Sequence, residues 1–254
     1  MEKIFFHSFR GGTGKSNISA NVSGCLALKG KKIVLIDLDI QSPGIHAVFG
    51  FNDNDIKKSL NDFLWGKCEI KDTVYTLSDT LDIGPGEIYF IPSSIRADDI
   101  IRILREGYDF TQLNKGFTSL EESFNPDYLI CDTHPGLYEE TLFSIAVADV
   151  LLTIMRPDAQ DFQGTAVTLE VSRKLNVPHL FLILNHVLMS ENPEKLKKNV
   201  EKRYNCTVLS MLPHTEDLLK MGSSHVFYIK YPNHPFSKEI ETISNKVISI
   251  TQEK

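Results

Sequence analysis

A glycine-rich stretch close to the start of the sequence has residue types that can hold phosphate groups. It reads Phe9-Arg10-Gly11-Gly12-Thr13-Gly14-Lys15-Ser16 and lies between a short apolar run and a stretch with helical spacing of apolar residues. A glycine-rich turn from a strand into a helix aims successive backbone N–H groups, and the positive end of the helix dipole, at one point. We therefore expect an anion at this turn, with Lys15 reaching its outer phosphates and the Ser16 hydroxyl available to Mg2+.

Acidic residues end two further apolar runs. Asp37 and Asp39 close the run at 32–39, and Asp132 closes the run at 128–132. Continuous apolar runs of this length are typical of strands buried on both faces of a parallel sheet. Ligands of such sheets lie at the carboxyl ends of the strands. The three carboxylates are therefore expected to face the same crevice as the glycine-rich turn.

The elements that position these groups alternate regularly between strand and helix. This alternation predicts an α/β fold with a doubly wound, mostly parallel sheet flanked by helices. The expected strands are 4–8, 32–39, 87–91, 128–132, 150–155, 180–184 and 208–212. The expected helices are 17–29, 58–65, 113–124, 139–147, 161–175, 215–221 and 235–250, with a further helix around 100–104. With 254 residues and 42% hydrophobic content, the chain is expected to form a single domain over 1–254.

The charge balance does not indicate a nucleic-acid partner. The chain has 27 Lys plus Arg against 33 Asp plus Glu, a net charge of −6, so no general attraction to nucleic acid is expected. The basic stretch at 191–203 is interleaved with acidic residues and is expected to be a solvated helix face. The four cysteines form no C-x-x-C pair, which argues against an iron–sulfur or structural zinc site and favours a reducing, cytoplasmic compartment. Neither a signal peptide nor a membrane span is expected.

These motifs and their order resemble the deviant P-loop of the MinD/ParA family of dimerising ATPases. The resemblance rests on the basic residue before Gly-Gly-x-Gly-Lys-Ser, the D-x-D at 37–39 and the D-T-x-P-G at 132–136, and it covers about residues 3–248. A strict P-loop pattern has a glycine where this chain has Phe9. Where the family has a lysine that reaches the partner's nucleotide across a dimer, this chain has Arg10. The resemblance implies a P-loop NTPase fold of the SIMIBI type, ATP and Mg2+ as ligands, and a homodimer formed with ATP.

The resemblance also implies a role for each site residue. The expected catalytic residues are Lys15, Asp39 and Arg10. The expected magnesium contacts are Ser16, Asp37 and Asp132. The expected nucleotide contacts are Gly11, Gly12, Thr13, Gly14, Lys15, Ser16, Asn17, Asn185 and Pro213. Within these sets, Asp39 is expected to position the attacking water and Asn185 to read the adenine. His134, inside the second switch region, is expected to be an ordinary loop residue.

The function predicted from these residues is a Mg2+-dependent, ATP-binding and ATP-hydrolysing molecular switch that dimerises with ATP. It resembles the spatial organisers that place a septum, a chromosome or another cargo, and its expected partners are a second copy of the chain and an unidentified regulatory or cargo protein. Two alternatives remain: a metabolic or assembly ATPase on the same fold, acting in cofactor or metallocluster maturation, and a non-hydrolysing ATP-binding scaffold.

The last predicted helix, at 235–250, has one feature of an amphipathic membrane anchor. It has an apolar stripe at Ile240, Ile243, Val247 and Ile250, but its polar face is not rich in Lys or Arg. The stripe is therefore expected to pack on the sheet, and no direct membrane anchor is expected.

Overall fold

The computed structural model describes residues 1–78, 81–188, 192–222 and 224–252, and these residues build an eight-stranded sheet. The strand order is β3-β4-β2-β5-β1-β6-β7-β8, in which β3 and β4 are antiparallel and the other neighbouring pairs are parallel. The strands are β1 Glu2–His7, β2 Lys32–Leu38, β3 Tyr75–Thr76, β4 Glu87–Ile91, β5 Tyr128–Thr133, β6 Val150–Met155, β7 His179–Val187 and β8 Val208–Pro213. The predicted fold class is therefore confirmed.

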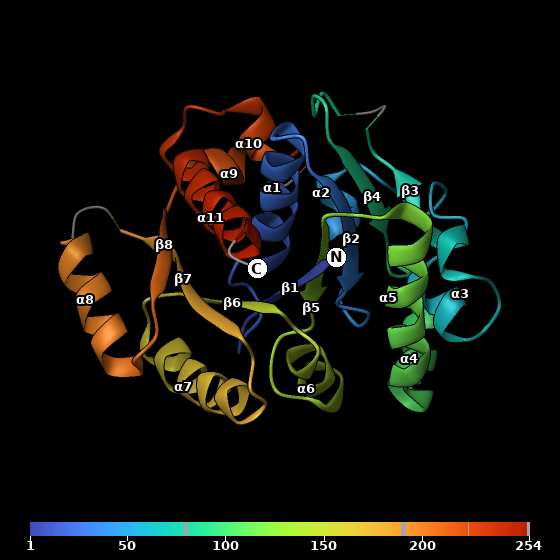
Figure 1. Cartoon of the computed structure of the whole chain (residues 1–254), viewed down its shortest axis with the longest axis horizontal. Coiled ribbons are helices and arrows are strands. Elements are labelled where there is room, and N and C mark those ends of the chain that lie inside the picture. The colour runs from blue at the N-terminus through green and yellow to red at the C-terminus, as the bar shows by residue number, and fades with distance from the viewer. Residues whose placement is uncertain (79–80, 189–191, 223, 253–254) are drawn as a thin grey trace.

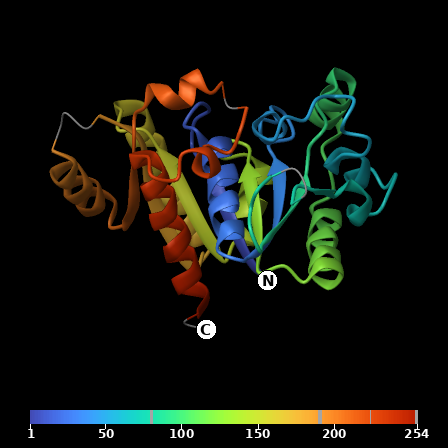
Figure 2. The ribbon, with the colours of Figure 1, turned by 90° about the horizontal axis from the view of Figure 1, so that it is seen from above.

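Helices cover both faces of this sheet (Figure 1). On one face lie α1 (Lys15–Leu28), α10 (Phe227–Lys230) and α11 (Pro235–Gln252), and on the other lie α5 (Phe110–Phe124) and α6 (Glu139–Ala146). The remaining helices are α2 Ile45–Val48, α3 Leu60–Leu64, the 3-10 helix η1 Ile70–Thr73, α4 Ala97–Glu106, α7 Ala159–Lys174, α8 Pro193–Tyr204 and α9 Glu216–Lys220. Figure 2 shows α11 alongside α1, with α8 at one end of the molecule and α4 and α5 at the other.

The central strands are buried on both sides. In β1, Ile4 and Phe6 belong to the core beneath α1 and α11, whereas Phe5 belongs to the core beneath α5 and α6. Because successive strand residues point to opposite faces, a strand covered on both sides must be apolar throughout. This requirement explains why the runs at 32–39 and 128–132 show no polar alternation before their terminal acids.

The predicted elements match the observed ones most closely in the strands. β4 and β6 have the predicted bounds, whereas β7 is longer than predicted because it continues through Asn185 and His186 to Val187. The pairing of β7 with β8 shifts between Leu184 and Val187, and His186 has a φ of 58°, so this end of the strand is bulged. The helices α2 and α10 were not predicted, because four residues are too few to show a helical period.

The C-terminal helix packs as predicted. Ile240, Ile243 and Val247 of α11 are fully buried and Ile250 is nearly so, and the helix contacts β8 and α1. In the part of the chain that the structure describes, no helix is long and apolar enough to cross a membrane.

Candidate nucleotide-binding site

The glycine-rich turn encloses a cavity between the end of β1 and the start of α1. Gly12 and Gly14 have φ angles of 75° and 88°, which residues other than glycine rarely adopt. Gly14 is the N-cap of α1, and no side chain caps this helix end, so its first N–H groups point to the cavity without a side-chain partner. The cavity has a volume of about 320 Å3. Its lining is Ser8, Gly11, Gly12, Thr13, Gly14, Lys15, Ser16, Asn17, Asp39, Ser42, Gly44, Val48 and Pro135.

Lys15 lines this cavity, and its ammonium lies within ion-pair distance of two carboxylates. Its Nζ is 3.1 Å from Asp132 Oδ1 and 3.6 Å from Asp39 Oδ2. Burial disfavours the charged ammonium, but the charges of Asp132 and Asp39 outweigh it and raise the pKa of Lys15. The structure thus brings together the predicted P-loop lysine and two of the predicted acids, which belong to different strands.

Asp132 has an acceptor atom that the protein does not satisfy. The residue is fully buried, its Oδ1 accepts from Lys15, and its Oδ2 has no hydrogen-bond partner. Burial raises the pKa of Asp132, while the charge of Lys15 and the nearby Ser16 hydroxyl oppose this rise. A buried, unpaired carboxylate oxygen beside a serine hydroxyl is a donor set that suits Mg2+, an ion that prefers oxygen ligands.

Asp37 is occupied by the backbone of the loop that follows β2. Its Oδ2 accepts from the N–H groups of Gly44 and Ile45, at 3.0 and 3.1 Å, and its Oδ1 accepts from Asp39 N at 3.1 Å. The carboxylate therefore holds the first turn of α2 against the end of β2. The predicted contact of Asp37 with a metal ion stays a prediction, and an ion there would share oxygens that already accept three hydrogen bonds.

Asp39 joins both loops that follow the acid-ended strands. Its Oδ1 accepts from Ser42 N at 3.2 Å and lies 2.7 Å from His134 Nδ1. The sequence analysis predicts that His134 is an ordinary loop residue and does not predict its contact with Asp39. The available signal was its position two residues beyond the acid that ends β5, on the same edge of the sheet as Asp39.

Asn185 lies against the glycine-rich turn rather than apart from it. Its Nδ2 donates to Thr13 O at 2.7 Å, and its Oδ1 accepts from His186 N at 2.9 Å. A Cβ on Gly14 would collide with the Asn185 amide, so the glycine makes this approach possible. Pro213 ends β8 beside the bulged end of β7. Their contact with an adenine base stays a prediction.

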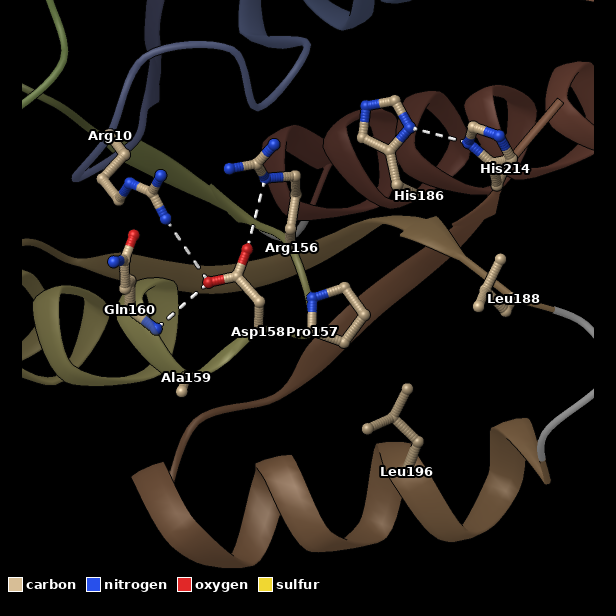
Figure 3. Close-up of a pocket in the computed structure, with 10 residues that line it drawn as sticks. All are labelled: Arg10, Arg156, Pro157, Asp158, Ala159, Gln160, His186, Leu188, Leu196 and His214. Atoms are coloured by element: carbon tan, nitrogen blue, oxygen red, sulfur yellow. Dashed lines mark hydrogen bonds and ion pairs between the residues drawn. The ribbon is translucent and has the colours of Figure 1, made fainter. Parts of the chain in front are cut away.

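Arg10 does not line the phosphate cavity but a second one, in which its guanidinium points toward Asp158 (Figure 3). Its Nη1 is 3.4 Å from both Asp158 Oδ1 and Asp161 Oδ1, at the start of α7. This cavity, of about 590 Å3, is lined by Arg10, Arg156, Pro157, Asp158, Ala159, Gln160, His186, Leu188, Leu196 and His214. The sequence analysis did not single out the two aspartates, although Asp158 and Asp161 lie in the segment between the end of the expected strand 150–155 and the start of the following helix, where ligands of such sheets bind.

The arrangement defines a P-loop nucleotide site: a glycine-rich turn, a lysine between two strand-end acids, and a doubly wound sheet. A family model described as an AAA domain matches residues 1–180, so the chain belongs to that family. Within it, the chain is a MinD/ParA-like P-loop ATPase by its relatives and its fold.

Two similar relatives illustrate this family membership. An uncharacterised ATP-binding protein of Methanocaldococcus jannaschii is 29% identical over 253 residues, covering 98% of this chain and 89% of that protein. The septum site-determining protein MinD of Bacillus subtilis is 24% identical over 229 residues, covering 88% of this chain and 80% of that protein.

Solved structures share the fold. The MinD cell division protein of Aquifex aeolicus superposes with a TM-score of 0.82 at 18% identity, covering 98% of this chain and 97% of that chain. A MinC:MinD complex of the same organism gives 0.81 at 18% identity, with 98% and 96% covered. MinD of Pyrococcus horikoshii, complexed with Mg-ADP, gives 0.79 at 20% identity, with 97% and 95% covered.

Proposed function

We propose that the chain is a cytoplasmic, Mg2+-dependent ATPase that dimerises when it binds ATP and works as a molecular switch for a regulatory or cargo protein. The observation that carries this proposal is the position of the Lys15 ammonium, 3.1 Å from Asp132 and 3.6 Å from Asp39 at the glycine-rich cavity. This cation lies beside a carboxylate oxygen of Asp132 that has no hydrogen-bond partner, at a helix start that no side chain caps. Together with Mg2+, these groups suit a triphosphate better than a neutral ligand.

In this proposal the triphosphate lies along the backbone from Gly11 to Ser16. Lys15 would move from the carboxylates to the β- and γ-phosphate oxygens and neutralise the charge that develops there. Mg2+, held by Ser16 and Asp132, would supply further charge neutralisation on the phosphates. Clusters of three or more His, Cys, Asp or Glu arranged to hold a metal are absent from the described residues, which is compatible with an ion completed by water and phosphate oxygens.

The reaction proposed is attack of water on the γ-phosphorus. The water oxygen forms a bond to the γ-phosphorus, while the bond between that phosphorus and the oxygen that bridges to the β-phosphate breaks. The bridging oxygen leaves with ADP, and the proton released by the water ends on inorganic phosphate. Asp39 would orient the water by accepting a hydrogen bond from it. Loss of the γ-phosphate would then remove contacts from both loops that follow the acids.

Phosphate release from the purified chain tests this proposal. We expect slow ATP hydrolysis that EDTA abolishes, and a shift from monomer to dimer with ATP but not with ADP.

Asp39→Ala should bind ATP and stay dimeric, because hydrolysis no longer ends the ATP state, with phosphate release reduced by about 100-fold. Wild-type phosphate release from Asp39→Ala would reject its role in orienting the water, and absence of Mg2+-dependent release from the wild-type chain would reject the ATPase.

A further inference from the structure

The loop after β5 is fixed at both sides of His134. On one side, Thr133 Oγ1 donates to Phe6 O at 3.0 Å and lies 2.9 Å from His7 Nδ1. On the other side, Gly136 N donates to Ser8 O at 2.9 Å. Both anchors belong to β1 and the residue that follows it, which lead directly into the glycine-rich turn. The position of His134 is thus set relative to the phosphate cavity.

The imidazole of His134 faces Asp39 and not the cavity. His134 Nδ1 is 2.7 Å from Asp39 Oδ1, and the Asp39 side chain is 8% exposed. Asp39 Oδ2 forms an ion pair with the Lys15 ammonium at 3.6 Å, and the carboxylate of such a pair accepts hydrogen bonds but does not donate them. The hydrogen between the two residues therefore sits on His134 Nδ1.

The two oxygens of Asp39 are consequently not equivalent. Oδ1 receives two donors, His134 Nδ1–H and Ser42 N–H, which come from the loops after β5 and after β2. Oδ2 faces Lys15 and the cavity. Two donors on Oδ1 fix the plane of the carboxylate, so the direction of Oδ2 is also fixed.

We propose that His134 is a positioning residue: it holds Asp39 with Oδ2 toward the γ-phosphate side of the cavity, where the attacking water must be oriented. This inference rests on the proposed ATP hydrolysis. The histidine acts through Asp39 and does not touch the reacting atoms. It also joins the two loops, so that a displacement of either loop turns the carboxylate away from the water.

The surroundings of His134 allow an isosteric test. The centroid of its ring lies 5.6 Å from that of the Tyr138 ring. His134 also lines a small cavity, together with Leu38, Ile40, Gln41, Ile103, Tyr108 and Glu140. His134→Leu keeps comparable bulk in this space but removes the donor. His134→Asn places an amide N–H close to where the imidazole has Nδ1. The pair therefore separates the hydrogen bond from the packing.

Steady-state ATP hydrolysis and ATP affinity are measured for both variants. We expect His134→Leu to lower kcat by about 10- to 100-fold with KM changed less than about twofold, and His134→Asn to stay within about threefold of the wild type in kcat. His179→Leu is the matched control, for which we expect an unchanged kcat. His179 is the first residue of β7, so it lies at the amino ends of the strands, whereas the site lies at their carboxyl ends.

Two results would overturn the positioning role. Wild-type kcat in His134→Leu excludes it, and an equal loss of kcat in His134→Leu and His134→Asn also excludes it, because the N–H donor of the asparagine would then not restore activity. A wild-type chain that does not hydrolyse ATP removes both this inference and the proposed function, whereas an active wild type with unaffected variants removes His134 alone. Independently of turnover, the Nδ1–H proton of His134 should be visible by NMR in the wild type and lost in Asp39→Ala; its persistence there would contradict the contact.

Discussion

At the scale of single residues, the site concentrates negative charge out of water. Asp37 and Asp132 are fully buried and Asp39 is 6% exposed. Burial raises the pKa of Asp37 well above its usual value, and the charges of Asp132 and Asp39 add to the rise. Lys15 is the cation that lies within ion-pair distance of two of these acids. In the ligand-free chain the lysine therefore has a second task, which is to balance the acids.

Replacing Lys15 by Met should destabilise the fold because a buried ion pair loses one partner. We expect the free energy of unfolding at pH 7.5 to fall by roughly 3 kcal/mol. Burial raises the pKa of Asp132, and without the Lys15 charge it rises further. The penalty is complete above this raised pKa and fades as the pH falls through it, because the folded state then takes up the proton.

Urea unfolding of Lys15→Met and wild type at pH 7.5 and pH 5.5 measures this difference. We expect a smaller loss at the lower pH. Lys198→Met, on the exposed face of α8, should change stability by less than about 0.5 kcal/mol at either pH. An equal loss for Lys15→Met at both values would mean that the carboxylates do not cause it.

At the scale of elements, the residue that breaks the strict P-loop pattern has its own packing partner. Phe9 stands where the pattern has a glycine, and its ring lies against Gly164 of α7. A Cβ on Gly164 would collide with this ring. The large side chain in the turn and the small residue in the helix thus complement each other, and they join α7 to the start of the phosphate cavity.

Gly164→Ala should therefore have opposite effects in two backgrounds. In the wild type we expect a loss of stability of about 1 kcal/mol or more, because overpacking outweighs the helix preference for alanine. In a Phe9→Ala background the collision is removed, and the same change should stabilise the chain by up to about 1 kcal/mol. Thermal unfolding of the four chains gives both values. A stabilising Gly164→Ala in the wild type would show that the ring does not fill this space.

The elements also show what the sequence could predict. The run 150–155 was placed correctly because a strand buried on both faces has an almost continuous apolar sequence, and the run 87–91 because a Gly-Pro-Gly turn precedes it and Pro92 follows it. The same reasoning placed Lys15, Asp39 and Asp132 in one crevice, and the structure brings them together. The contact between His134 and Asp39 was missed because it depends on the rotamers of two loop residues. The pair of Phe9 with Gly164 was missed because nothing in the local pattern links a turn to a distant helix.

At the scale of the whole molecule, Arg10 is positioned for a contact other than the one proposed for the dimer. It lies 3.4 Å from Asp158 and Asp161 of its own chain, with its side chain 35% exposed. The pair with Asp158 joins two partly exposed groups and stabilises the protein by about 0–1 kcal/mol. Asp161 is buried, and its Oδ2 still accepts from Arg156 N at 2.8 Å when Arg10 leaves. Release of Arg10 from α7 therefore costs little free energy. A guanidinium can bind phosphate oxygens in a bidentate manner. The proposed dimer would gain this contact when two nucleotide sites face each other.

Arg10→Ala should accordingly separate ATP binding from dimerisation. The phosphate cavity is lined by Gly11–Asn17 and not by Arg10, so we expect ATP affinity within about threefold of the wild type. Dimerisation with ATP, followed by light scattering, should be lost, since the charge that would reach the second nucleotide is gone. Arg10→Lys keeps the charge on a flexible stem and should restore dimerisation in part. Arg105→Ala, on the exposed surface of α4, controls for the loss of one positive charge and should dimerise normally. If Arg10→Ala dimerises like the wild type, the guanidinium has no part in the dimer and its place is with Asp158 and Asp161.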